Sequence, residues 1–86
     1  MFKKMLIAVI ANSQEDLCAV VDVARDYAKS YRIGVYNDKK DTLITLYISK
    51  GKFKRMAKRM NNSGYELEER SNGYIYTIKK VKGSEA

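Results

Sequence analysis

The segment that most constrains the fold is residues 5–11, MLIAVIA, which is apolar at every position. A run of this length that contains β-branched residues is typical of a strand buried on both faces. An edge position would leave many of these side chains in water, so we expect this strand near the centre of a sheet. One alternative stays open here. Apolar residues from Phe2 to Leu17 also keep helical spacing, so residues 2–11 are either a strand or an extension of the first helix.

Two further segments carry the apolar spacing of an amphipathic helix. The first covers residues 14–31 and follows Asn12 and Ser13, two residue types that cap helix N-termini. The second covers residues 51–61 and stops at residues 62–64, Asn-Ser-Gly, whose glycine readily takes a left-handed conformation. Each helix is therefore predicted to dock through one apolar face.

Four other segments are predicted to be strands, joined in pairs as two hairpins. The strands are residues 32–36, 42–49, 65–69 and 74–81. Between the first pair, residues 37–41 have the turn-forming sequence NDKKD. Between the second pair, residues 71–73 contain Asn-Gly, the strongest short hairpin signal.

The resulting element order is β-α-β-β-α-β-β. A chain of 86 residues builds one modest core, so we expect one domain over residues 1–81 and a loose C-terminal tail at 82–86. Hairpin pairing and right-handed crossovers predict an α+β fold with one antiparallel sheet, two helices on one face and an extra edge strand. This arrangement is ferredoxin-like, and because many unrelated functions share it, it implies no particular activity.

The face of the sheet that the helices leave open is a candidate binding surface. Four tyrosines on or beside the strands are candidate base-stacking or subunit-interface residues, namely Tyr36, Tyr47, Tyr74 and Tyr76. A homodimer through this face is one hypothesis, because apolar surfaces that carry tyrosine are common at subunit interfaces. The alternative is that tyrosine is simply a good strand former.

The formal net charge of +7 is concentrated in one segment. Residues 1–49 carry seven basic and six acidic residues, and residues 61–86 carry four of each. Residues 50–60 carry six basic residues and no acidic one. A focused cluster of this kind creates a local field that attracts anions, whereas scattered lysines serve mainly solubility.

The second helix combines an apolar face with a wholly cationic one. The apolar face is formed by Phe53, Met56, Ala57 and Met60, and the cations are Lys50, Lys52, Lys54, Arg55, Lys58 and Arg59. Like charges four residues apart repel, and exposed helices ordinarily pair glutamate with lysine instead. Such a row of cations matches the phosphates along a nucleic-acid backbone.

These six cations are therefore the predicted contacts of a small nucleic-acid-binding protein with little base specificity, DNA or RNA. Lys79, Lys80 and Lys82 are candidates to extend the patch. Two alternatives remain. The helix is either an ordinary solvated surface or part of a protein–protein interaction module, a small regulator or inhibitor that docks on an acidic partner.

Composition argues against catalysis, metal binding and a cofactor. The chain has no histidine and one cysteine, Cys18, so neither an internal disulfide nor a cysteine zinc cluster can form. Glu66, Glu68 and Glu69 cluster without a further ligand nearby, and we expect this group to pair with lysines such as Lys79. A phosphate at Gly51 would meet helix amides, but the glycine spacing is not that of a P-loop.

The cysteine content also bears on location. A single cysteine favours a reducing compartment, so we expect a cytoplasmic protein. Residues 1–12 resemble a signal peptide, yet they are too short for one. The apolar run is also well below the ~20 residues that span a bilayer, so no membrane partner is expected.

Overall fold

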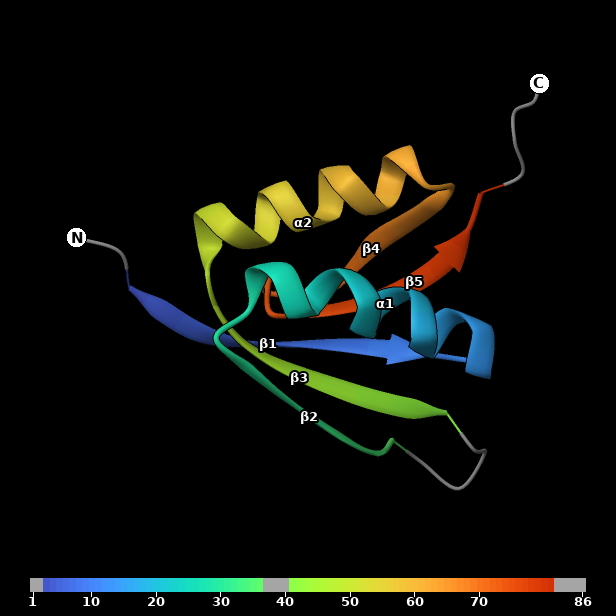
Figure 1. Cartoon of the computed structure of the whole chain (residues 1–86). Helices are drawn as coiled ribbons and strands as arrows, with labels where there is room; N and C mark the ends of the chain where they lie inside the picture. The colour runs from blue at the N-terminus through green and yellow to red at the C-terminus, as the bar shows by residue number, and fades with distance from the viewer. Residues whose placement is uncertain (1–2, 37–40, 82–86) are drawn as a thin grey trace.

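The structure, a computed structural model, describes residues 3–36 and 41–81. Figure 1 shows its elements in the predicted β-α-β-β-α-β-β order. They are β1 (Lys4–Ala11), α1 (Gln14–Tyr27), β2 (Ser30–Val35), β3 (Thr42–Ser49), α2 (Lys50–Asn62), β4 (Tyr65–Ser71) and β5 (Ile75–Lys80). Residues 37–40 of the first predicted turn and the predicted tail at 82–86 lie outside the described residues.

The five strands form one sheet in the order β2-β3-β1-β5-β4. The apolar strand β1 is central, with β3 antiparallel on one side and β5 parallel on the other. The predicted α+β fold is confirmed, and residues 4–11 are a strand rather than a helical extension.

One pairing differs from the all-antiparallel sheet that we predicted, because β1 and β5 run parallel and the sheet is mixed. The physical reason is the route of the chain. It leaves β3 through α2, enters the sheet at its far edge as β4, and turns back inward. A strand that hairpins back from that edge must lie beside β1 and run in the same direction as β1.

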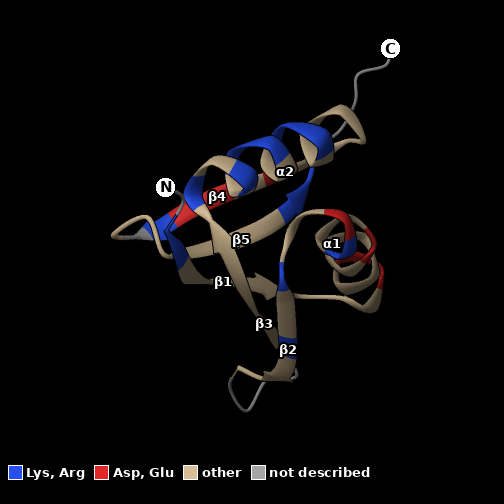
Figure 2. Ribbon diagram, turned by 60° about the vertical axis from the view of Figure 1, so that its left-hand side comes forward, with Lys and Arg blue, Asp and Glu red and all other residues tan. Residues whose placement is uncertain are grey.

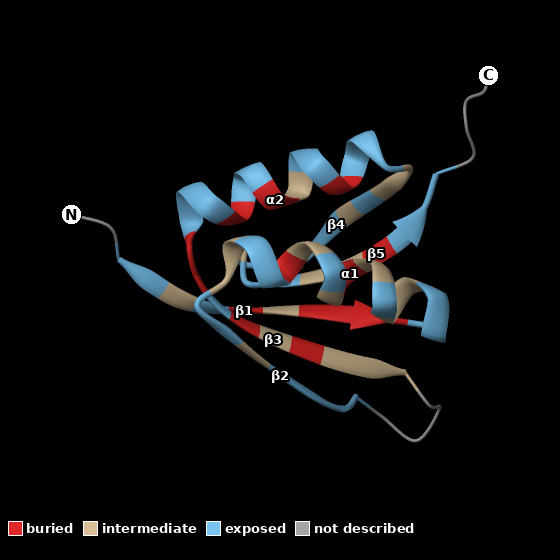
Figure 3. Ribbon diagram, in the orientation of Figure 1, coloured by how far each residue is buried: buried red, intermediate tan, exposed pale blue. Residues whose placement is uncertain are grey.

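Both helices lie on one face of the sheet, as Figures 1 and 3 show. Between the helices and this face lies a single buried cluster to which every element except β2 and β4 contributes fully buried side chains. Its members are Ile7, Val9, Ala11, Val20, Ala24, Ile44, Leu46, Ile48, Phe53, Met56, Met60 and Ile78. Removing these side chains from water is the main force that holds the helices on the sheet.

Helix α1 ends at Tyr27, four residues before the predicted end at residue 31. Ala28 takes an extended conformation, with φ −83° and ψ 149°, and the backbone N–H of Lys29 donates to the carbonyl of Tyr47 at 2.8 Å. Pairing with β3 therefore begins where the apolar helical pattern still continues. Tyr31, the last residue of that pattern, lies in β2 opposite Leu46.

The second face of the sheet carries apolar side chains, and neither of the two described helices lies over it. Leu6 and Tyr47 are cross-strand partners on this face, and Leu6 is 63% exposed. Ile75 pairs with Ala8 on the neighbouring strands and is also exposed. The apolar character of β1 on both sides thus has two sources, the core under the helices and this open strip.

Candidate nucleic-acid interface

Helix α2 carries the cationic cluster and is positioned by its own apolar face. Ser49 ends β3 and caps the helix, because its hydroxyl oxygen accepts a hydrogen bond from the N–H of Lys52 at 3.3 Å. Phe53, Met56 and Met60 are buried, as predicted from their spacing. Burial of this stripe fixes the helix orientation, so the remaining side chains must face solvent or the flank of α1.

All six predicted contact residues are exposed, which Figure 3 shows as the pale outer surface of α2. Figure 2 shows α2 as blue stretches that alternate with tan ones, and the helix has no acidic residue. Within the part of the chain that the structure describes, five of the six have no carboxylate within ion-pair distance, namely Lys50, Lys52, Lys54, Arg55 and Lys58. Their charge is therefore available to an external anion.

Arg59 is the exception among the six. Its Nη1 atom donates to Oδ2 of Asp26 on α1 at 2.9 Å, and its guanidinium lies 5.8 Å from the centre of the Tyr27 ring. Interactions with Tyr27 and then with Asp26 raise the pKa of Arg59. Arg59 thus links α2 to α1, and its charge is already partly satisfied within the protein.

By helical geometry the six cations on α2 form two flanking pairs with a third pair between them. At about 100° per residue, Lys52 and Arg59 lie on the flank next to α1, and Lys50 and Lys54 lie on the other flank. Arg55 and Lys58 stand between these two pairs on the crest of the helix. The cationic surface is therefore wider than a single line of side chains.

The start of α2 violates the charge preference that α1 follows. The first turn of α1 contains Glu15 and Asp16, which favour the positive end of the helix dipole. The first turn of α2 contains no acid and has Lys50 and Lys52 instead. Two cations at that helix end are unfavourable in the free protein, and a bound anion would relieve the repulsion.

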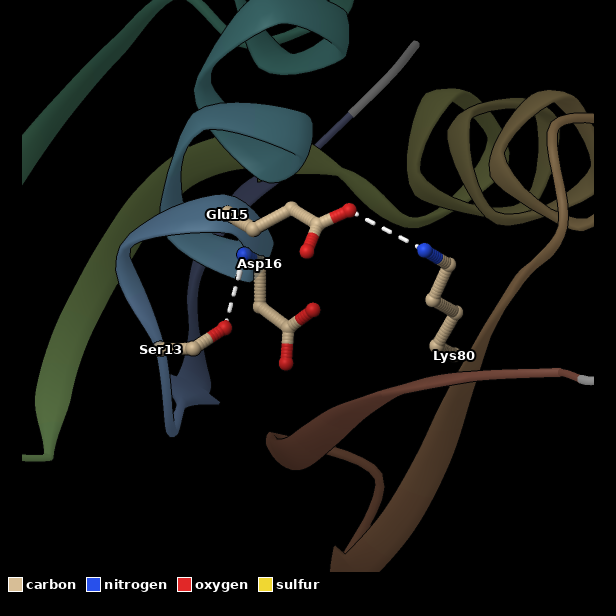
Figure 4. A network of polar contacts seen from close by, with 4 residues as sticks. All are labelled: Ser13, Glu15, Asp16 and Lys80. Carbon is tan, nitrogen blue, oxygen red and sulfur yellow. Dashed lines mark hydrogen bonds and ion pairs between the residues drawn. The ribbon is translucent and has the colours of Figure 1, made fainter.

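The proposed C-terminal extension of the patch is largely paired with the protein's own acids. Figure 4 shows Lys80 on β5 reaching Glu15 on α1, with Nζ and Oε2 3.0 Å apart, next to the Ser13 cap. This contact with Glu15 raises the pKa of Lys80. Lys79 lies 4.0 Å from Glu68, the type of pairing predicted for the acidic strand, and Lys82 lies outside the described residues.

The four candidate tyrosines do not form one surface. Tyr76 points to the helix side and packs on Phe53, with ring centroids 4.7 Å apart. Burial, with a smaller effect from Glu69, raises the pKa of Tyr76. Base stacking on this ring is therefore obstructed by α2. Tyr47 lies on the open face, while Tyr36 and Tyr74 flank the ends of their strands and are exposed.

Beside the start of α2 lies a cavity of about 530 Å³ that the sequence did not predict. Its lining comes from the start of β1, the end of α1, the end of β3 and the first turns of α2. It includes the cations Lys4, Lys29, Lys52 and Arg55. Lys4 and Lys29 could not be assigned to a site from the sequence, because only the tertiary fold brings them to α2.

Other candidate chemistry is sparse in the described ranges 3–36 and 41–81. They contain no group of three or more histidine, cysteine, aspartate or glutamate residues that could hold a metal ion. Cys18 is exposed on α1. Among the same residues, no helix has the length and apolar character needed to cross a membrane.

Comparison with known proteins identifies no relative of this chain. The chain has no significant match to a protein family, to a curated protein or to a solved structure. Function must therefore be argued from the cationic surface of α2 and its surroundings.

Proposed function

We propose that this protein binds nucleic acid non-enzymatically, holding the phosphate backbone against the outer surface of α2. The observation that carries the proposal is the set of five exposed cations that lack carboxylate partners among the described residues. They lie on one helix of 13 residues with no acid. The predicted contact set is Lys50, Lys52, Lys54, Arg55 and Lys58, with Arg59 acting mainly as a link to Asp26.

Contacts of this kind position a nucleic acid without reading its bases. Lysine and arginine bind phosphate oxygens through charge and release counterions, and α2 offers no asparagine or glutamine before its last turn. The proposal therefore includes little sequence preference. It also includes no catalytic step and no cofactor, and it places the protein in the cytoplasm on the basis of the single cysteine.

A homodimer through the open sheet face is the second part of the proposal. The apolar strip that includes Leu6 lies between Arg32 near one edge of the sheet and Glu66 and Glu68 near the other. A two-fold axis parallel to the strands would bring the sheet edge that carries Arg32 in one copy over the β4 edge of the second copy, which carries these glutamates. Such a dimer would carry two α2 surfaces on its outer sides.

The first experiment measures binding of labelled single- and double-stranded DNA and RNA by fluorescence anisotropy at several salt concentrations. Five phosphate contacts predict a log–log salt slope of about −4.5 on duplex DNA and an affinity loss of about 500-fold between 50 and 200 mM salt. Each of Lys54→Gln and Lys58→Gln should reduce the slope by about 0.9. Arg25→Gln, at an exposed position on α1, is the control and should leave the slope unchanged.

Absence of binding at low salt to all four nucleic acids would overturn the proposal and favour the acidic-protein alternative. Oligomeric state is measured separately by light scattering. The wild type is expected to be dimeric, and Leu6→Lys is expected to be monomeric because it places a charge in the apolar strip. A monomeric wild type would remove the dimer while leaving the α2 surface intact.

A further inference from the structure

We propose that the cavity beside the start of α2 binds a terminal phosphate monoester of a nucleotide. This inference rests on the proposed function, because α2 would carry the backbone that ends there. It also goes further, because it assigns a separate pocket and a chemical group. The source of the group is either the phosphorylated end of a strand or a free mononucleotide.

The side chains that line the cavity carry a net positive charge. Among the residues that the structure describes, the lining contains four cations and one carboxylate, that of Asp26. Asp26 is held by Arg59 at 2.9 Å, so the one negative charge that would repel a phosphate is offset by a guanidinium outside the lining. A monoester carries up to two negative charges and gains more from such a site than a backbone diester does.

The cations come from separate parts of the chain, and their backbones are fixed. Lys4 lies on β1 opposite Ser49, and the N–H of Lys29 donates to the Tyr47 carbonyl at 2.8 Å. Lys52 is fixed by the hydrogen bond from its own N–H to the Ser49 hydroxyl. Three lysines around the cavity thus have fixed backbones, so less conformational entropy is lost when a ligand binds.

The remaining lining matches the rest of a nucleotide. Tyr27, Ala28 and Ile48 give the cavity an apolar part beside its cationic part. A volume of about 530 Å³ lies within the range of about 300–1,000 Å³ typical of small-molecule sites. Inorganic phosphate would leave the apolar part unused, whereas a sugar or base would cover it.

The first turn of α2 adds directed donors to the cavity. Gly51 lines the cavity, and an added Cβ at this position would have no heavy atom within 4 Å, so the backbone is open to approach. The first amides of a helix have no intrahelical acceptor, and Ser49 occupies only that of Lys52. A phosphate in the cavity would therefore meet amide donors as well as lysine side chains.

The test compares oligonucleotides of one sequence that carry a 5′-phosphate, a 3′-phosphate or only hydroxyl ends. The wild type should bind one phosphorylated form about tenfold more tightly than the hydroxyl form. The double variant Lys4→Gln/Lys29→Gln should bring this ratio close to one. The matched control Lys54→Gln/Lys58→Gln loses the same charge outside the cavity, and it should weaken all three oligonucleotides while keeping the ratio.

A ratio near one in the wild type, or a ratio unchanged by Lys4→Gln/Lys29→Gln, would overturn a strand-end site. Titration calorimetry with adenosine monophosphate, and with adenosine as its control, covers the second source. If no oligonucleotide binds, the proposed function fails on its own. The cavity assignment then stands only if the monophosphate binds and Lys29→Gln abolishes that binding while Lys29→Arg retains it. Absence of binding by both the strand ends and the monophosphate would overturn the inference entirely.

Discussion

Replacing Lys54 by glutamate should stabilise the protein and weaken nucleic-acid binding in the same molecule. Lys54 is exposed and lies four residues from both Lys50 and Lys58 on α2. In the wild type both pairs repel, and in Lys54→Glu both become attractive. The variant therefore shows separately how much stability the like charges on α2 remove and how much Lys54 contributes to nucleic-acid affinity.

The size of the effect follows from these two pairs. A like-charge pair at this spacing costs about 0.2–0.5 kcal/mol on an exposed helix, and an opposite pair contributes a similar amount. Converting two pairs should raise the free energy of unfolding by about 1 kcal/mol, which raises Tm by about 4–8 °C in a domain of this size. Lys54→Gln removes only the repulsion and should give about half of that gain.

The measurements are thermal unfolding by circular dichroism at low and at high salt, and fluorescence anisotropy with single-stranded DNA. The gain in Tm should shrink at high salt, because salt screens exposed charges. Affinity at low salt should fall about tenfold. Arg25→Glu on α1 makes the same change in net charge away from the cationic surface of α2, and it should leave affinity nearly unchanged.

Two results would refute this reasoning. A variant that melts at or below the wild-type temperature would show that the lysines on α2 do not repel appreciably. A variant that is more stable but binds DNA as tightly as the wild type would show that the nucleic acid contacts another surface.

Two further predictions concern single side chains. Because burial against Phe53 raises the pKa of Tyr76, its phenol stays protonated in the folded protein at pH values where the unfolded chain ionises. Stability should therefore fall as pH rises from about 10 through the folded pKa. Tyr76→Phe should reduce this loss of stability, measured by urea unfolding at about pH 8 and about pH 10.5. An equal loss in the variant would contradict the raised pKa of Tyr76. Asp26→Asn removes a carboxylate from the cavity and frees Arg59, so phosphate-bearing oligonucleotides should bind about two- to tenfold more tightly in anisotropy titrations. Unchanged or weaker binding would count against the cavity.

The elements of the fold were largely predictable from local patterns. The strand at residues 42–49 matches β3, and the helix at residues 51–61 differs from α2 by one residue at each end. These segments carry clear periodicity, 2 for the strand and 3.6 for the helix, and their boundaries coincide with turn or capping residues. The end of α1 was not predictable from the local pattern, because it depends on tertiary pairing. Lys29 pairs with β3 instead of extending the helix.

The candidate site also has one part that was predictable from the sequence and one part that was not. The cationic face of α2 was predictable because all of its residues lie within one helix, where spacing determines direction. The pairing of Arg59 with Asp26 was not predictable, because these residues are far apart in sequence and meet only when α1 packs on α2. The same applies to the position of Tyr76 under α2 and to the approach of Lys4 and Lys29 to the cavity.

Gly51 gives the sharpest test of whether the start of α2 is built for a ligand. Glycine in a helix is less favourable than alanine by up to about 1 kcal/mol, and a Cβ at this position would meet no atom within 4 Å. Gly51→Ala should therefore raise the free energy of unfolding by about 0.5–1 kcal/mol in urea titrations. The added methyl group would stand in the cavity lining, so the preference for a phosphorylated strand end should fall.

Gly34 on β2 is the matched control, since a Cβ there also meets no atom within 4 Å and the residue does not line the cavity. Gly34→Ala should leave the phosphate preference intact. If Gly51→Ala stabilises the fold and keeps the preference, the backbone at residue 51 is not approached by phosphate, and the lysines alone must account for binding. If both stability and the preference change as expected, Gly51 lowers the stability of the helix, and access of an anion to the helix amides explains why glycine is present there.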